Sequence, residues 1–204
     1  MIAQPQVSRR YTAEEYLTQE IASDWRHEYI NGEIVPMTGG TPDHNQILLN
    51  LAGALNMSLA QQPYRVFAAD QRLWIPQANL YTYPDIMVVQ GTLAYQSGRR
   101  DTITNPTLIV EVLSNSTSNY DRGGKFAACR RIPSLLEYLL VDQYSPHLEH
   151  HVKTAPKQWL LQEYDGLGTT LTLSHLDFTM LLRDLYHKVQ FEADGTDAVL
   201  DGPN

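Results

Sequence analysis

The stretch Pro106-Thr107-Leu108-Ile109-Val110-Glu111-Val112-Leu113-Ser114 decides the fold. Residues 108–113 are apolar except for Glu111, which predicts a central strand buried on both faces. Because burying an unpaired charge is very costly, Glu111 needs a compensating partner. A divalent metal ion is one such partner, and a buried ion pair with an arginine such as Arg72 is the structural alternative.

A second strand-like run with a single carboxylate precedes it, at Tyr83-Pro84-Asp85-Ile86-Met87-Val88-Val89. The polar loop between the two runs, residues 90–105, has a length more typical of functional segments than of simple connections. If the two strands are neighbours in one sheet, Asp85 and Glu111 converge. Together with the backbone carbonyl of Val112 they would give Mg²⁺ the oxygen ligands that it prefers. The alternative role for Asp85 is to cap a strand or to bind a turn amide.

A candidate cation follows the central strand. The run Tyr120-Asp121-Arg122-Gly123-Gly124-Lys125 begins a helix that we predict over about residues 121–131. The ammonium of Lys125 could orient an attacking water or neutralise charge that develops on a phosphorane. A lysine on a helix is also commonly a solvated surface charge, so both readings of Lys125 stay open.

An Asn31-Gly32 pair lies between two strand-like runs, residues 26–30 and 33–37, and predicts a β-hairpin because both turn residues need a positive φ. Glu33 then begins the second strand, where it serves either the site or the solvated surface. His44 lies near a predicted helix start, where we expect a polar surface or packing role.

The remaining pattern predicts alternating helices and strands. A capping box at Thr12 and Glu15 opens one helix, and Thr41-Pro42 opens a second that ends near Gln62-Pro63. Further strands are expected at residues 65–69, 72–75, 138–141, 148–152, 159–164 and 170–173, with a turn region at 79–83 and a closing helix at 178–188. The three tryptophans are expected to pack in the core or against a sheet rather than to stack on bases: Trp25, Trp74 and Trp159.

The length of 204 residues fits one domain over residues 12–190, with a leader at 1–11 and an acidic tail at 191–204. The net charge of −8 argues against a general nucleic-acid coat protein, so contact with DNA must be local or mediated by a metal. No apolar run approaches the ~20 residues of a membrane helix. Cys129 is the only cysteine, which excludes an intrachain disulfide and fits a cytoplasmic location.

The ordered motifs resemble the Uma-type restriction endonuclease family of the PD-(D/E)XK nuclease superfamily. The resemblance covers roughly residues 12 to 188, and the matching segments are 26–37, His44-Asn45, 83–86, 109–114, 120–126 and 136–141. It implies a restriction-endonuclease-like α/β fold with a mixed central sheet flanked by helices, extended here by an N-terminal hairpin and a C-terminal β-meander.

The resemblance also implies a site. Asp85, Glu111 and the carbonyl of Val112 would hold Mg²⁺, or Mn²⁺ in its place, and Glu33 would be an additional acidic residue. The superfamily places a lysine two residues after the glutamate, where this chain has Leu113. Some branches of the superfamily carry this lysine on the following helix, which is where Lys125 lies.

Two functions of different classes follow. The first is a Mg²⁺-dependent endonuclease that hydrolyses DNA phosphodiester bonds, and a hydrolase of another phosphoester would share its site. The second is a catalytically inactive binding module with the nuclease fold, which Leu113 and the negative charge support. A homodimer would suit the first function, because cutting two strands needs two sites.

Overall fold

The computed structural model describes residues 9–191, and residues 1–8 and 192–204 lie outside this range. Most of the predicted leader and nearly all of the predicted acidic tail therefore fall outside the described residues. Among residues 9–191, no helix combines the length and the apolar composition that crossing a membrane requires.

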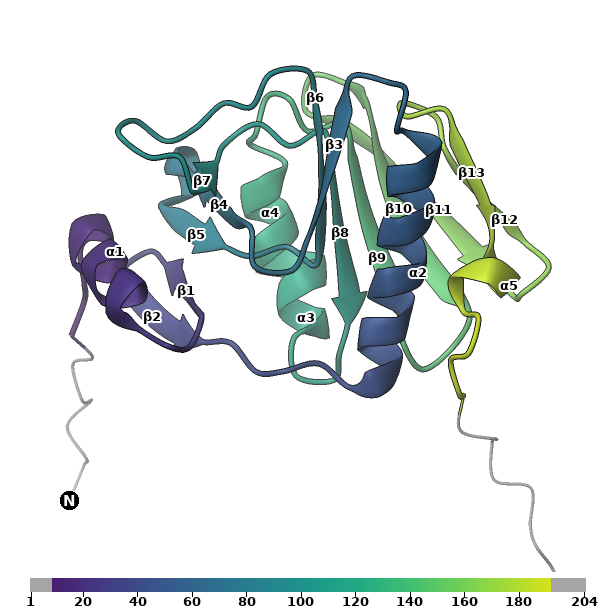
Figure 1. The fold of residues 1–204 in the computed structure, drawn as a ribbon, viewed down its shortest axis with the longest axis horizontal. Coiled ribbons are helices and arrows are strands. Elements are labelled where there is room, and N and C mark those ends of the chain that lie inside the picture. The colour runs from purple at the N-terminus through teal and green to yellow at the C-terminus, as the bar shows by residue number, and fades with distance from the viewer. Residues whose placement is uncertain (1–8, 192–204) are drawn as a thin grey trace, which may run out of the picture.

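A six-stranded main sheet forms the centre of the molecule, in the order β11-β10-β9-β8-β6-β3 (Figure 1). Its central strand β8 pairs in parallel with β9 and antiparallel with β6. All six residues of β8 are buried, which confirms the predicted central strand. The bounds are β3 Tyr64–Ala68, β6 Ile86–Gln90, β8 Leu108–Leu113, β9 Glu137–Asp142, β10 His147–Ala155 and β11 Gln158–Asp165.

A second sheet has the order β2-β1-β5-β4-β7. Its hairpin confirms the predicted turn, with φ of 47° at Asn31 and 99° at Gly32. The predicted turn region at 79–83 is wrong over Leu80–Thr82, which form β5 because they pair with β1 on one side and β4 on the other. The bounds are β1 His27–Ile30, β2 Glu33–Pro36, β4 Arg72–Ile75, β5 Leu80–Thr82 and β7 Thr102–Ile103.

Helix α2, Pro42–Ser58, covers one face of the main sheet and begins at the predicted cap, Thr41. The other face packs against the second sheet and a helical segment. This segment consists of α3 Ser118–Tyr120, a π-helical turn η2 Asp121–Lys125, and α4 Phe126–Cys129. The main sheet therefore lies between two layers, as the predicted α/β class requires.

The two ends of the described chain pack on these layers. Helix α1, Ala13–Ala22, has the predicted capping box between Thr12 and Glu15 and packs through Tyr16 onto the second sheet. At the other end, the predicted helix at 178–188 is wrong in its first part. Strand β13, Phe178–Leu181, pairs there with β12, Thr170–Leu173, and only Leu182–Leu185 are helical, as α5. Residues 178–181 form a strand despite the helical spacing of their apolar side chains, because β12 pairs with them.

The tryptophans behave in two ways. Trp74 stacks on Tyr81 and Trp159 packs edge-on against Phe126, so both pack against neighbours as predicted. The prediction for Trp25 is wrong, because it lies between α1 and β1 and is 77% exposed.

The packing of α2 gives a test of the fold. Leu51 is fully buried against the main sheet, whereas Leu49 on the same helix is 64% exposed. We expect Leu51→Ala to lower the free energy of unfolding by about 2–5 kcal/mol, because it leaves a cavity in the core. Leu49→Ala should change it by about 0.5 kcal/mol or less. Urea denaturation measures both, and equal losses would contradict the packing described.

Candidate active site

A buried ion pair joins the central strand to the helical segment beside it. Glu111 of β8 places Oε1 2.9 Å from Nζ of Lys125, and the two residues are 3% and 5% exposed. The partner of Glu111 is therefore Lys125. The alternative pair with Arg72 is wrong, because that guanidinium bonds to Tyr83 and lies 3.7 Å from Asp101.

Lys125 is the last residue of the π-helical turn η2. Such turns are rare and often occur at functional sites. Here the turn places Asp121 Oδ1 3.7 Å from Nζ of Lys125. A side chain at Gly124 would lie 3.2 Å from the ring of Tyr120, which favours glycine at this point of the turn.

A third carboxylate reaches Lys125 from the second sheet. Glu28 of β1 has Oε1 3.5 Å from Nζ, and the same oxygen accepts a short hydrogen bond from the hydroxyl of Thr82. Glu33, the acidic residue singled out from the sequence, is exposed at the start of β2. Among the described residues it makes no ion pair with Lys125, so the structure brings Glu28 to the cluster instead.

Asp85 lies immediately before β6 and is held by two donors on one oxygen. Its Oδ2 accepts a hydrogen bond of 2.7 Å from the backbone N–H of Val112 and lies 3.2 Å from Nε2 of His44. Both contacts use Oδ2, so Oδ1 keeps its lone pairs for another ligand. The N–H of Val112 also fixes the Asp85 carboxyl beside the residue that follows Glu111, which confirms that the two strands are neighbours.

The register of the sheet explains why Val112 offers a carbonyl at this place. Ile86 of β6 pairs with Val110 of β8, so one more step along the ladder sets Pro84 against Val112. In an antiparallel ladder the N–H and C=O of one residue point to the same side. The Val112 carbonyl therefore points toward Asp85, and proline has no N–H to donate to it. Pro84-Asp85 thus ends the ladder at the site.

His44 is a site residue that the sequence reading missed. It lies in the first turn of α2, where its backbone N–H donates a hydrogen bond to the hydroxyl of Thr41, the N-cap residue. Thr41 in turn donates to the Gln143 side chain, and Gln143 donates to the carbonyl of Leu113 with a bond of 2.7 Å. This chain of hydrogen bonds ties the start of α2 to the end of β8 and holds His44 over Asp85. The His44-Asn45 match was the only sequence signal for it.

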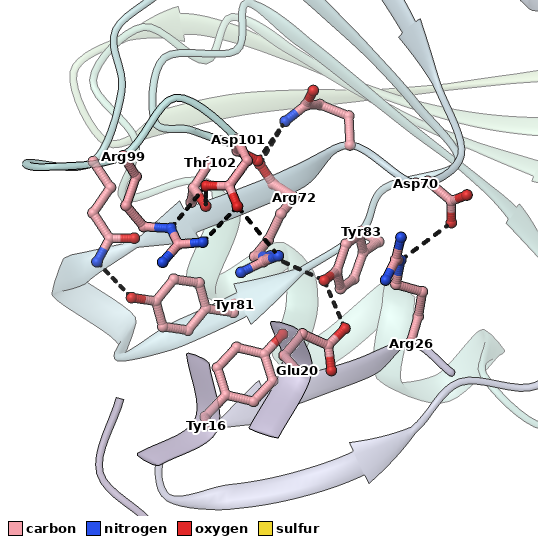
Figure 2. Close-up of polar contacts among 12 residues, drawn as sticks. Tyr16, Glu20, Arg26, Asp70, Arg72, Tyr81, Tyr83, Arg99, Asp101 and Thr102 are labelled. Atoms are coloured by element: carbon pink, nitrogen blue, oxygen red, sulfur yellow. Dashed lines mark hydrogen bonds and ion pairs between the residues drawn. The ribbon is translucent and has the colours of Figure 1, made fainter. Parts of the chain in front are cut away.

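Figure 2 shows the polar network that anchors the segment before Asp85. Tyr83 donates a hydrogen bond of 2.7 Å to Glu20 of α1 and accepts one of 2.9 Å from Arg72 of β4. Burial, together with the hydrogen bond to Glu20, raises the pKa of Tyr83 to about 12, so its hydroxyl keeps the proton that it donates. Tyr83 therefore fixes the chain two residues before Asp85.

The cluster holds more carboxylates than cations. The basic groups of the cluster are Lys125 and His44. They contact four acidic side chains: Glu28, Asp85, Glu111 and Asp121. Burial raises the pKa of Glu111 well above its ordinary value, and the charges of Asp121 and Asp85 add to this effect.

The pKa values of the two basic groups also rise, although burial acts to lower them. Burial alone would lower the pKa of Lys125, but the charges of Glu111 and Glu28 raise it well above its ordinary value, so Lys125 stays an ammonium. Burial likewise acts to lower the pKa of His44, but the hydrogen bond to Asp85, the charge of Asp85 and the smaller effects of Asn45 and Asp121 together raise it, so the net shift is upward.

The residues fit a hard divalent cation in a site with few protein ligands. Among residues 9–191, no three His, Cys, Asp or Glu side chains form a metal-binding group. The Oε1 atom of Glu111 is buried and receives no well-directed hydrogen bond, although Lys125 is close. Two carboxylates, one carbonyl and several waters make a ligand set that Mg²⁺ accepts. A further positive charge would also balance the acidic excess.

Comparisons with known proteins show which family this chain resembles. The model of the Uma2 family, described as "Putative restriction endonuclease", matches residues 13–182. The uncharacterised protein sll1609 of Synechocystis sp. is 39% identical over 165 residues, which cover 81% of this chain and 93% of that protein. A second uncharacterised protein of that organism, slr1290, is 32% identical over 182 residues, covering 89% and 94%.

A solved structure has the same fold. The crystal structure of "a putative nuclease belonging to DUF820" from Anabaena variabilis matches with a TM-score of 0.70 and 18% identity. The match covers 86% of this chain and 97% of that chain. The predicted restriction-endonuclease-like α/β class therefore agrees with a nuclease fold.

The buried pair can be tested by stability. We expect Lys125→Met to lower the free energy of unfolding by about 3–5 kcal/mol at neutral pH, because Glu111 loses its buried partner. In this variant the folded-state pKa of Glu111 lies even further above its unfolded value. The stability that protonated Glu111 contributes is present at low pH and lost as the pH rises, so the deficit shrinks as the pH falls.

The matched control for this test is Arg122→Met in the same helical turn. Arg122 pairs with Glu149 at a partly exposed position, and we expect a loss of about 1 kcal/mol or less. Urea denaturation in EDTA over a pH series measures both variants. A deficit in Lys125→Met that does not change with pH would contradict the role given to Glu111.

Proposed function

The chain belongs to the Uma2 family, and from this membership we propose that it is a metal-dependent endonuclease that hydrolyses DNA phosphodiester bonds. One observation carries the proposal. Asp85 and the main chain next to Glu111 are hydrogen-bonded on adjacent strands, and the ammonium of Lys125 lies 2.9 Å from Glu111. A nuclease of this superfamily needs this combination of two acids and one cation at the same place.

Asp85, Glu111 and the carbonyl of Val112 would hold the metal, with Mg²⁺ as the expected ion and Mn²⁺ as its substitute. When bound, such an ion polarises a phosphoryl oxygen and lowers the pKa of a water. His44 and the N–H of Val112 hold Oδ2 of Asp85, which turns Oδ1 toward the ligand. The protein thereby orients the carboxylate before any ligand arrives.

Lys125 would act on the attacking water or on the charge that develops on the phosphate. Its ammonium is already fixed by Glu111, Glu28 and Asp121 at 2.9, 3.5 and 3.7 Å. Leu113, at the position of the standard lysine, is buried in the apolar layer between the main sheet and the helical segment. Lys125 instead reaches the carboxylate of Glu111 from the π-helical turn. We assign the additional acidic role expected of Glu33 to Glu28, because Glu28 contacts Lys125 and Glu33 does not.

One observation favours the second candidate, an inactive module that binds through the nuclease fold. The three carboxylates around Lys125 would also hold its ammonium in a purely structural cluster. In that case Lys125 stabilises the fold and takes no part in chemistry. Cleavage and metal-binding assays separate the two functions.

The central test is cleavage of supercoiled plasmid DNA with Mg²⁺ or Mn²⁺. We expect nicking that EDTA abolishes and that Asp85→Ala and Glu111→Ala reduce by roughly a hundredfold or more. Even indirect partners of metal ligands commonly contribute 10–100-fold. The control is Glu163→Ala on the far edge of the main sheet, where the side chain is 60% exposed, and it should cleave as the parent does.

Two results would reject the nuclease. One is cleavage that persists unchanged in Asp85→Ala. The other is a combination of three results: no cleavage, no calorimetric binding of Mn²⁺, and DNA binding that Glu111→Ala leaves intact. This combination would establish the inactive module.

The acidic partner of Lys125 can be assigned by comparing two conservative variants. Glu28→Gln removes a charge 3.5 Å from the ammonium, whereas Glu33→Gln changes an exposed residue of the neighbouring strand. We expect Glu28→Gln to lower the cleavage rate by at least roughly tenfold more than Glu33→Gln. Of these two carboxylates, it is that of Glu28 that helps to position the ammonium of Lys125. Circular dichroism checks that both variants fold, and the reverse order of losses would return the role to Glu33.

A further inference from the structure

Among the described residues, the main sheet has a long unpaired edge at β11, three strands away from β8. β11 pairs with β10 on one side, and no strand of residues 9–191 pairs with its other side (Figure 1). Leu160 and Leu161 are 50% and 47% exposed, so both faces of this strand are about half exposed at its middle. A long edge with free N–H and C=O groups and exposed apolar side chains is a template for another strand.

The register of the sheet shows which backbone groups of β11 point outward. The N–H of Lys153 in β10 donates to Leu136 next to β9, so odd-numbered residues of β10 face β9 and even-numbered ones face β11. His151 of β10 lies opposite Leu161 of β11. In an antiparallel ladder opposite residues both face the partner or both face away. The outward N–H and C=O groups therefore belong to Trp159, Leu161 and Glu163.

We propose that β11 pairs with the β11 strand of a second copy of this chain, antiparallel and centred on Leu160. The two main sheets then form one continuous sheet across a two-fold axis. The inference rests on this edge alone and does not depend on the nuclease proposal.

Only registers that bring odd-numbered residues opposite one another can use the outward groups. Centring on Leu160 brings Leu160 onto its own copy and sets Trp159 opposite Leu161 twice. It also places Lys157, at the turn before β11, opposite Glu163, which is 60% exposed. Cross-strand pairs of apolar residues and of opposite charges both stabilise a ladder.

The neighbouring register is less complementary. Centring on Leu161 would set Trp159 against Glu163 and Leu160 against Gln162, so the apolar side chains would mostly meet polar ones. Lys157 would then lie opposite Asp165, whose carboxylate contacts His147 at 2.8 Å within its own chain, a closer contact than the 3.9 Å between Glu163 and the same histidine. The register centred on Leu160 therefore satisfies more of the side chains.

A cysteine placed at the centre of the interface tests the register. In a non-hydrogen-bonded antiparallel pair the two Cα atoms are about 4.5 Å apart, within the range that a disulfide bridges. We expect Leu160→Cys, mildly oxidised, to migrate mostly as a dimer on a non-reducing gel and to return to monomer with reductant. Cys129 is fully buried and should not cross-link.

Leu161→Cys is the matched control, because the proposed register offsets the two copies of residue 161 and places their Cα atoms roughly 8 Å apart, beyond disulfide reach. Preferential cross-linking of Leu161→Cys would overturn the register. Cross-linking of neither variant, with a monomeric mass for the parent by light scattering, would overturn the dimer.

A second variant tests the backbone pairing itself. The N–H of Leu161 faces outward, so Leu161→Pro removes a donor of the interface and leaves the ladder to β10 intact. We expect this variant to keep the circular dichroism of the parent and to raise the dimer dissociation constant at least tenfold. A Leu161→Pro protein that dimerises as the parent does would reject pairing through β11. The proposal would also be rejected if the parent is monomeric and a different partner binds at this edge.

Discussion

The charge of Glu111 in the middle of β8 is the constraint on which the site is built. The strand is buried on both faces, so the protein must supply at close range what water would supply at the surface. Lys125 does so from the helical segment, and Glu28 and Asp121 then hold the ammonium in place. The result is a buried cluster with an excess of negative charge, which suits a divalent cation.

Much of this could be read from the sequence because it depends on local pattern. The apolar run around Glu111, the Asn31-Gly32 turn and the Thr41 cap each specify a local conformation, and the structure confirms each one. The pairing of Asp85 with the strand of Glu111 followed from the expectation that the two strands are neighbours.

The features that the sequence did not predict depend on contacts between segments that are distant in the chain. Glu28 and Glu33 lie on the two strands of one hairpin, and only the docking of that hairpin on the helical segment decides which acid meets Lys125. The same reason explains β5, whose three residues directly follow the turn residue Asn79 but have strand partners on both sides. His44 was missed because nothing in the spacing of a helix start tells which strand end it will cover. The π-helical turn has no sequence signature beyond its glycines.

The mixed origin of the cluster has a consequence for how the protein matures. Asp85 and Glu111 meet as soon as β6 and β8 pair, but Glu28 arrives only when the second sheet docks on the helical segment. Glu28 is farther from Lys125 along the chain than Asp85 is from Glu111, so its contact carries the larger loop-closure cost. A nascent or partly folded chain therefore lacks a complete cluster. For the nuclease proposed above, this order of assembly would delay cleavage until the second sheet has docked.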